Sequence, residues 1–199
     1  MINVLGLVDH DKQVINESFK ALSEKYECTL ENDQIDMFTN KIYSLKLLKM
    51  FTTTSIKNIF EIHLKGRSFY IISIYLANFR ERLEPRVHIY GFMTLKKDMG
   101  DIHIRPETIW DKIGDIFNKR DIDIPEHKGF SDKYCLFAKD RDFAKSNLPV
   151  PFLEEVYQLK KLHMTFEESI MLATFNNKIQ VNETMELAGF MERISQFFA

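Results

Sequence analysis

The sequence predicts an α+β protein in which a mainly antiparallel sheet is packed against helices. Segments rich in Ile, Phe, Tyr and Val gather in the middle of the chain, and such side chains fit a pleated sheet. Stretches with apolar residues at helical spacing lie on both sides of these segments. Strands and helices do not alternate regularly along the chain, as they do in parallel sheets. Together these observations favour the α+β class.

The size and composition predict a single globular domain that spans residues 1–199. Apolar residues make up 45% of the chain and aromatic residues 13%, which is more apolar surface than a disordered chain has. The 27 Lys and Arg residues against 29 Asp and Glu residues leave a formal net charge of -2. Such a charge gives no field that attracts nucleic acid, so a nucleic-acid partner is not expected.

The first predicted element is an amphipathic helix from Asp9 to Tyr26. Its apolar residues recur at helical spacing and predict one buried face, formed by Val14, Ile15, Phe19 and Leu22. Asp9 or Asp11 is expected to cap the helix, because a carboxylate oxygen accepts hydrogen bonds from the free N–H groups at a helix start.

The segment from Gln34 to Phe51 has two interpretations. Its apolar residues fit a helix, yet Ile42 to Leu47 also fits a strand, and we favour the helix. In that helix three lysines alternate with apolar residues, namely Lys41, Lys46 and Lys49. This pattern is typical of a basic amphipathic helix that lies on a membrane or on a partner, and also of an ordinary helix with one buried face.

The middle of the chain predicts successive antiparallel strands. Their expected ranges are Ile59 to Leu64, Ser68 to Ala77, Val87 to Leu95 and, after Gly100, Asp101 to Arg105. Lys65-Gly66-Arg67 is short and contains glycine, so it is expected to close a hairpin directly. The polar stretch from Asn78 to Arg86 predicts a looser connection.

The C-terminal half predicts helices mixed with shorter strands. Pro106 is expected to open a helix that runs to Phe117, because proline at a helix start loses no hydrogen bond. The next predicted elements are a strand from Lys133 to Ala138, a turn from Asp140 to Asp142 and a helix opened by Pro149 and Pro151. Met164 to Thr165 and Ser169 to Phe175 predict a strand pair or one bent strand. The last predicted elements are a turn at Asn176-Asn177, a strand from Lys178 to Val181 and a helix from Glu183 to Phe197.

A series of short motifs between Val87 and Val181 resembles an uncharacterised bacterial domain family. The motifs are Ile104-Arg105-Pro106-Glu107, Asp121-Ile122-Asp123-Ile124, Phe130 with Tyr134, and Ala138-Lys139-Asp140, in this order. Members of that family often carry membrane helices as well. The resemblance implies one compact α+β domain and carries over no activity, cofactor or catalytic residue.

Three histidines form the most specific candidate site. His63, His88 and His103 each stand between two apolar residues of a predicted strand, so alternation places each on the face opposite the core. If the three strands are neighbours in register, the three imidazoles converge on a zinc-like ion. The other interpretation is three unrelated histidines on a polar or helix-covered face.

Several classes of site find no support in the sequence. The 7 glycines are spread apart and form no phosphate-binding loop. Acidic pairs such as Asp121 with Asp123 and Asp140 with Asp142 fit a cation site, but also surface strands and turns. Cys28 and Cys135 are far apart without a metal-ligand or catalytic signature, which predicts reduced thiols in a cytoplasmic protein.

Membrane segments and export signals are not expected either. The residues from Met1 to Asp9 lack the basic and apolar regions of a signal peptide. The apolar stretch from Phe69 to Phe79 falls short of the roughly 20 residues that a transmembrane helix needs. We therefore expect no integral membrane segment, while peripheral membrane contact stays open.

The preferred hypothesis is a cytoplasmic bacterial, non-enzymatic interaction or ligand-binding domain. Its partner would be a protein or a small apolar ligand, held by some of the many Phe and Met side chains. The alternative is a metal-dependent or acid–base enzyme with its site on the histidine-bearing face of the sheet. The sequence indicates no particular cofactor.

Overall fold

The computed structural model describes residues 2–3, 6–45, 48, 53–78, 83–107, 121–175 and 179–198. The chain forms two compact units. Unit 1 comprises Met1–Met93 and Thr174–Glu192, and unit 2 comprises Thr94–Ala173 and Arg193–Ala199. Each unit is described by itself below, and the single domain expected for residues 1–199 stays a prediction.

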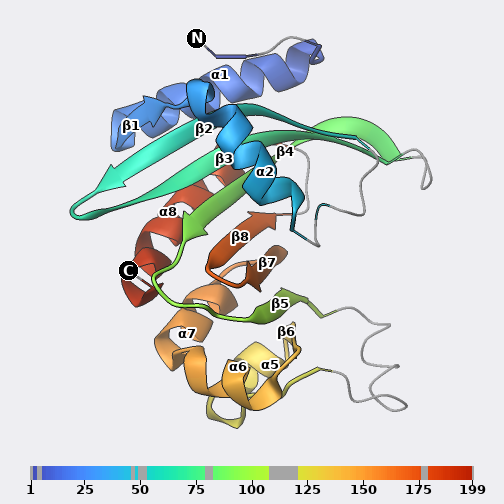
Figure 1. Ribbon diagram of the computed structural model, residues 1–199, viewed down its shortest axis with the longest axis vertical. Coiled ribbons are helices and arrows are strands. Elements are labelled where there is room, and N and C mark those ends of the chain that lie inside the picture. The colour runs from blue at the N-terminus through green and yellow to red at the C-terminus, as the bar shows by residue number, and fades with distance from the viewer. Residues whose placement is uncertain are drawn as a thin grey trace. The chain divides into compact units, whose positions relative to one another are not determined.

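Unit 1 is built on long antiparallel strands in the order β1-β2-β3-β4 (Figure 1). The strands are β1 (Glu27–Leu30), β2 (Thr53–Leu64), β3 (Arg67–Asn78) and β4 (Leu83–Thr94). Lys65 and Gly66 alone connect β2 to β3. Gly66 has a φ of 76°, which glycine adopts without steric cost in so tight a hairpin.

The two faces of this sheet are covered by different helices. Phe60, Ile71 and Gly91 form one row across the sheet, because Phe60 pairs with Ile71 and Ile71 with Gly91. Phe60 stacks on Phe19 of α1 (Asp9–Lys25) with ring centroids 5.2 Å apart. A side chain at Gly91 would meet Met191 of α8 (Val181–Phe198), so α1 and α8 cover the same face.

The opposite face is covered by α2 (Ile35–Tyr43), which follows the short 3-10 helix η1 (Asn32–Gln34). Tyr70 and Phe92 are paired neighbours on this face. Phe38 of α2 packs against both rings, with centroid distances of 4.7 and 5.2 Å. Figure 1 shows α2 in front of the strands and α8 behind them.

Unit 2 contains a second set of strands in the order β8-β7-β5-β6. They are β5 (Asp101–Pro106), β6 (Tyr134–Ala138), β7 (Leu162–Glu167) and β8 (Ile170–Phe175), whose last two residues fall in unit 1. Strand β5 pairs antiparallel with both β6 and β7. Its alternation places Ile102 and Ile104 in the core, with exposed fractions of 1% and 0%.

The helices that lie wholly within the described residues of unit 2 are short. They are the 3-10 helix η2 (Pro125–His127), α5 (Lys128–Ser131), α6 (Arg141–Asn147) and α7 (Val150–Gln158). Phe152 of α7 packs against Phe166 of β7 and against Phe198 at the end of α8, with ring centroids 5.9 and 5.1 Å apart. These rings form the aromatic centre of the core of unit 2.

The predicted α+β class with a mainly antiparallel sheet and covering helices is confirmed. The structure also has the first helix, the hairpin at Gly66, the strand after Gly100 and the closing helix where the sequence predicts them. The short strand β1 was not predicted; its four residues carry too weak a pattern to separate from a loop.

Five local predictions differ from the structure. Leu83 to Arg86, predicted as part of a loose connection, belong to β4. Pro106 ends β5 opposite Tyr134 instead of opening a helix, because a residue before proline favours extended backbone and extends the strand up to it. Asp140 caps α6 instead of forming a turn. Val181 begins α8 rather than ending a strand. The start of α1 has no side-chain cap, although Asp9 lies in its first turn, where negative charge favours the helix dipole.

Some predicted elements lie outside the described residues. They are residues 108–117 of the predicted helix, the turn at 176–177, Lys178, and Lys46, Lys49 and Phe51 of the predicted basic helix. The described part of the basic segment supports the helical interpretation, because α2 contains Phe38 and Ile42 with both side chains buried. No helix among the described residues is long and apolar enough to cross a bilayer.

Candidate functional site

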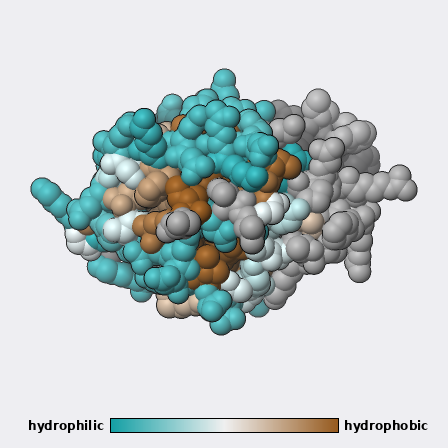
Figure 2. Space-filling view, turned by 90° about the horizontal axis from the view of Figure 1, so that it is seen from above, coloured by the Kyte–Doolittle hydropathy of each residue, from teal (hydrophilic) through white to brown (hydrophobic). Residues whose placement is uncertain are grey.

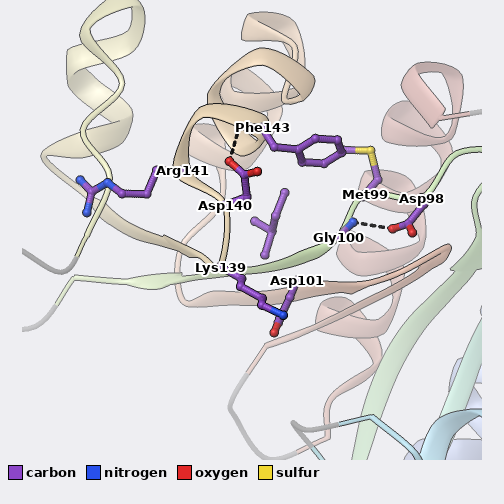
Figure 3. Close-up of a pocket in the computed structure, with 9 residues that line it drawn as sticks. Asp98, Met99, Gly100, Asp101, Lys139, Asp140, Arg141 and Phe143 are labelled. Carbon is purple, nitrogen blue, oxygen red and sulfur yellow. Dashed lines mark hydrogen bonds between the residues drawn. The ribbon is translucent and has the colours of Figure 1, made fainter.

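A pocket of about 750 Å³ opens in unit 2 where two segments meet (Figure 3). Residues 98–102 lead into β5, and residues 139–143 connect β6 to α6. The antiparallel pairing of β5 with β6 brings the start of one beside the end of the other, and Lys139 N donates to Asp101 O at 3.1 Å. The sheet register therefore creates the pocket from segments far apart in sequence.

The floor of the pocket is apolar. Met99, Ile102 and Phe143 line it, and Met99 and Ile102 are 2% and 1% exposed. Two backbone hydrogen bonds fix this segment to the β7–β8 turn: Met99 N donates to Glu168 O at 2.8 Å, and Glu168 N donates to Gly100 O at 2.9 Å. The floor is thus anchored by main-chain bonds rather than by flexible side chains.

Charged residues surround this floor, and two of the carboxylates are held by the backbone. Asp98 accepts a hydrogen bond from Gly100 N at 2.7 Å, and Asp140 accepts one from Phe143 N at 2.9 Å. The second bond caps α6 and so places Asp140 at the rim. Both contacts are drawn as dashed lines in Figure 3.

The cations of the rim point elsewhere. Arg141 donates through Nη2 to Asp121 O at 2.9 Å and extends away from the other labelled side chains in Figure 3. Lys139 extends to the side of β5 opposite Phe143, next to Asp101 in the same view. In this view both cationic side chains are thus directed away from Phe143.

One further cation contacts the pocket wall. Lys97 Nζ lies 5.7 Å from the centroid of the Phe143 ring, a distance at which the negative face of an aromatic ring attracts positive charge. The same ammonium group donates to Asn147 Oδ1 on α6. The Phe143 ring thus already serves as a cation acceptor for a neighbouring part of the chain.

The lining residues that the structure describes include no Ser, Thr, Cys, His or Tyr. These residue types supply most nucleophiles and most proton-transfer groups in enzymes, although carboxylates also serve as bases. The arrangement of an apolar floor with fixed polar groups at the rim is that of a site that binds and orients a small molecule.

The structure places two of the three predicted metal ligands in unit 1, and it does not bring them together. His63 is in β2 and His88 is in β4, with β3 between these strands. His63 pairs with Ser68, whereas His88 pairs with Ile74, which in turn pairs with Ile56. The neighbouring register that convergence requires is therefore not met for these two histidines.

Each of these histidines has its own environment. His63 Nε2 lies 3.0 Å from Thr29 Oγ1 of β1. Burial, followed by the charge of Arg86, lowers the pKa of His88 to about 4. Among the residues that the structure describes, no group of three or more His, Cys, Asp and Glu side chains is arranged to hold a metal ion.

His103, the third predicted ligand, lies in unit 2 beside a histidine that the sequence analysis did not single out. His103 pairs with Thr165 of β7, so His163, two residues before Thr165, lies on the same face at the level of Arg105. Burial, followed by the charges of His103 and Arg105, lowers the pKa of His163 to about 4. Leu162-His163-Met164 repeats the apolar-His-apolar pattern, which was the available signal.

Aromatic and cationic side chains complete this face of unit 2. Arg105 lies over the Phe137 ring at 5.1 Å from its centroid, and the His103 ring stacks on Phe137 at 6.4 Å. Burial and Arg105 lower the pKa of His103. The face thus favours neutral imidazoles, and none of these side chains lines the pocket.

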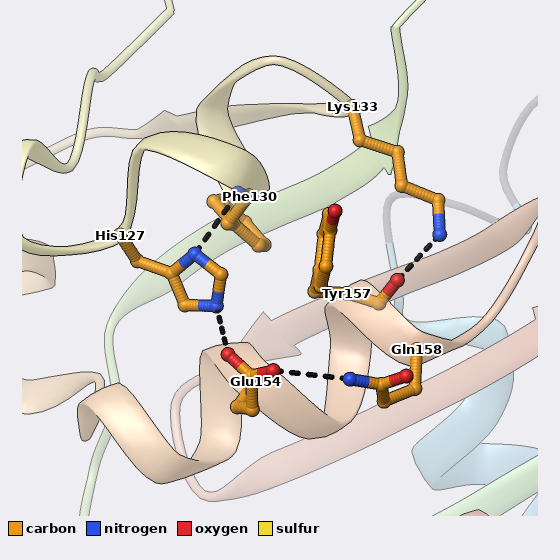
Figure 4. A network of polar contacts seen from close by, with 6 residues as sticks. All are labelled: His127, Phe130, Lys133, Glu154, Tyr157 and Gln158. Carbon is orange, nitrogen blue, oxygen red and sulfur yellow. Dashed lines mark hydrogen bonds and ion pairs between the residues drawn. The ribbon is translucent and has the colours of Figure 1, made fainter.

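A separate polar network joins α5 to α7 (Figure 4). His127 Nδ1 accepts a hydrogen bond from Phe130 N at 3.0 Å, and His127 Nε2 lies 2.5 Å from Glu154 Oε2. Glu154 also accepts from Gln158 Nε2 at 3.0 Å. Since both ring nitrogens of His127 are engaged, the network holds two helices together and leaves no nitrogen for a ligand.

The predicted membrane or partner surface is described only in part. Lys41 is exposed on α2, while Lys46 and Lys49 lie outside the described residues. Figure 2 shows apolar side chains reaching the surface in the middle of the face seen from above, with hydrophilic side chains around them. A contact of Lys41 with a membrane or a partner stays a prediction.

Neither Cys28 nor Cys135 forms a disulfide bond. Burial raises the pKa of the Cys28 thiol to about 11. A thiol with so high a pKa is a poor nucleophile, because the thiolate is the reactive form. Cys135 is buried in β6 with an exposed fraction of 1%.

Comparisons with known proteins give one structural likeness. No family model matches the chain, and no curated protein matches it. The chain is similar to the crystal structure of the mycobacterial trehalose monomycolate transport factor A, TtfA, with a TM-score of 0.54 and 9% sequence identity, over 96% of this chain and 98% of that chain. At this identity the likeness shows the fold alone. The resemblance to a bacterial domain family stays a prediction.

Proposed function

We propose that the chain is a non-enzymatic binding protein that holds a small molecule with an apolar body in the pocket of unit 2. The observation that carries this function is the pocket itself. Its volume of about 750 Å³ lies within the range of about 300–1,000 Å³ that is usual for small-molecule sites.

The chemistry of the lining supports binding rather than catalysis. Burial of an apolar ligand surface against Met99, Ile102 and Phe143 would supply affinity, at roughly 25 cal/mol per Å² of apolar surface removed from water. The fixed carboxylates of Asp98 and Asp140 would orient the ligand. Affinity and orientation of this kind require no movement of the backbone, which the bonds to Glu168 hold in place.

The structural neighbour gives limited support. That protein is described as a trehalose monomycolate transport factor. A binding function would be compatible with that description, but a similar fold does not imply the same ligand. The ligand of this chain is therefore inferred from its own pocket.

A fluorescence titration tests this function. Nile red, a neutral dye that brightens in apolar surroundings, is added to the full chain and to Phe143→Ala. Removal of the ring is expected to weaken binding about tenfold, which corresponds to about 1.4 kcal/mol. Phe137→Ala is the matched control, because Phe137 is a half-buried ring of the same unit outside the pocket.

Two results would contradict this function. Dye binding of equal strength in the wild-type chain, Phe143→Ala and Phe137→Ala would place the dye elsewhere. A wild-type chain that binds no dye would show that the pocket does not accept apolar molecules. Circular dichroism of each variant shows that it is folded before it is compared.

A further inference from the structure

We infer that the ligand of the unit 2 pocket is an organic ammonium ion, a positively charged amine joined to an apolar body. This inference rests on the function proposed above and adds the charge of the ligand to it. It is carried by the placement of two carboxylates, one aromatic ring and the apolar floor within a single pocket.

The two carboxylates are fixed at the rim of the pocket. Asp98 and Asp140 each accept one backbone hydrogen bond, which holds the carboxylate in place. Neither forms an ion pair with a cation among the described residues. Figure 3 shows the two groups on either side of Phe143 and Met99. An ammonium group above this floor would lie between two negative charges.

The two cations that line the pocket are directed away from its floor. Arg141 is directed toward the backbone oxygen of Asp121, at 2.9 Å, and away from the floor. Lys139 extends to the other side of β5, next to Asp101 (Figure 3). An anionic ligand on the floor would therefore face Asp98 and Asp140, and like charges at short range disfavour binding.

The aromatic ring gives an independent indication. Lys97 already lies over Phe143 at 5.7 Å, so the chain itself places an ammonium group against this ring. The ring attracts cations through its negative face, and the nearby carboxylates strengthen the same preference. A ligand with an ammonium group and an apolar tail would satisfy the charges at the rim and cover Met99 and Ile102 on the floor.

The test compares three octyl compounds that differ only in charge: octylammonium, octanol and octanoate. Binding to the full chain is measured by isothermal titration calorimetry at low salt and neutral pH. We expect octylammonium to bind about tenfold more tightly than octanol, and octanoate to bind most weakly. Raising the salt concentration is expected to reduce the difference, because salt screens exposed charges.

A double variant removes the charge and keeps the geometry. In Asp98→Asn with Asp140→Asn, each amide oxygen still accepts the backbone hydrogen bond, and asparagine is as good a helix cap as aspartate. We expect this variant to bind octylammonium and octanol equally. The matched control is Asp142→Asn, an exposed carboxylate of the same helix outside the pocket, which is expected to keep the preference.

The outcomes separate this inference from the proposed function. If octanol and octanoate bind as tightly as octylammonium, and Phe143→Ala weakens all of them, the pocket binds apolar ligands and the inference about charge is overturned. If the double variant keeps the preference for octylammonium, the carboxylates are not its cause and the inference is also overturned. If none of the compounds and no Nile red binds, the proposed function itself fails.

Discussion

The backbone N–H of Phe143 donates a hydrogen bond to Asp140 Oδ1 at 2.9 Å, so one carboxylate both starts helix α6 and stands at the rim of the pocket. The same helix turn presents the Phe143 ring to the pocket. Helix capping and the proposed ligand binding thus involve the same two residues. Asp140→Asn removes the charge and keeps the hydrogen-bond acceptor, so the effects of charge and geometry can be measured separately.

The capping role gives the first prediction. Asp140→Ala is expected to lower the free energy of unfolding by about 1 kcal/mol, because the helix start loses its acceptor, whereas Asp140→Asn is expected to stay within about 0.5 kcal/mol of wild type. Urea denaturation measures both. Asp142→Ala serves as the control for charge on the same helix. Equal stability of Asp140→Ala and Asp140→Asn would contradict the capping role.

The contact of Gly91 with Met191 gives the second prediction. A Cβ at Gly91 would lie 2.6 Å from Met191 Sδ, so Gly91→Ala forces the buried Met191 side chain to shift and is expected to cost about 1–3 kcal/mol. Met191→Ala is expected to cost about 2–5 kcal/mol through the cavity that it leaves.

The double variant tests the same contact. Gly91→Ala with Met191→Ala is expected to be more stable than the sum of the single effects indicates, because the added methyl group occupies part of the cavity. Thermal and urea unfolding supply the four free energies of this cycle. Additive effects would show that α8 does not approach β4 at Gly91.

Buried Asn58 gives the third prediction. Its side chain accepts from Asn3 N at 2.7 Å and donates to Asn3 O at 3.0 Å and to Ser73 Oγ at 3.2 Å. Asn58→Ala leaves buried polar partners unsatisfied, so we expect a loss of about 1–3 kcal/mol. Ser73→Ala removes one of these bonds and is expected to cost less.

Hydrogen exchange locates this effect in the chain. The amide of Asn3 is expected to exchange much faster in Asn58→Ala than in Ser73→Ala, because only the first substitution removes its acceptor. Unchanged protection of Asn3 in Asn58→Ala would show that Asn58 does not hold the N-terminal segment.

The pH dependence of stability gives the fourth prediction. Burial, His103 and Arg105 lower the pKa of His163 from 6.5 to about 4, so the folded state binds this proton less readily than the unfolded state. The stability contribution is complete above pH 6.5 and is lost as the pH falls from 6.5 toward 4. His88 is expected to add to the same fall, since burial and Arg86 lower its pKa to about 4.

The variant His163→Gln isolates this contribution. Its stability is expected to change less than that of wild type over the same pH window, because glutamine does not titrate. His10→Gln, at an exposed position on α1, is the control and is expected to follow the wild-type curve. Identical pH curves for His163→Gln and wild type would contradict the role of His163.

The sequence predicts much of the fold and little of the site, for physical reasons that particular residues show. Ile59 to Leu64 and Val87 to Leu95 carry branched and aromatic side chains at alternating positions, and that pattern depends only on the local backbone. The order of the strands depends on the whole chain, so alternation at His63 and His88 does not reveal that β3 lies between them. Sequence reasoning therefore recovers neighbours that a tight hairpin joins, such as β2 and β3, but not the pairing of distant strands such as β5 and β7.

The pocket illustrates the same difference. Asp98 and Asp140 are far apart in sequence and become neighbours of one floor only through the pairing of β5 with β6. The sequence does mark Asp140 as a turn residue, since aspartate favours both turns and helix starts. The sequence does not indicate that the start of α6 lies in the same pocket as Met99. His163 stands between Leu162 and Met164, so it has the same apolar-His-apolar pattern as the three predicted metal ligands.

The most direct test of the binding function maps where a ligand lies. Octylammonium is titrated into the isotope-labelled full chain, and backbone amide shifts are followed by two-dimensional NMR. We expect the largest chemical-shift changes at the amides of Met99, Gly100 and Phe143, which line the pocket, and small changes at β2 and β3 of unit 1. Largest shifts on unit 1, or shifts of similar size throughout the chain, would contradict a binding site in unit 2.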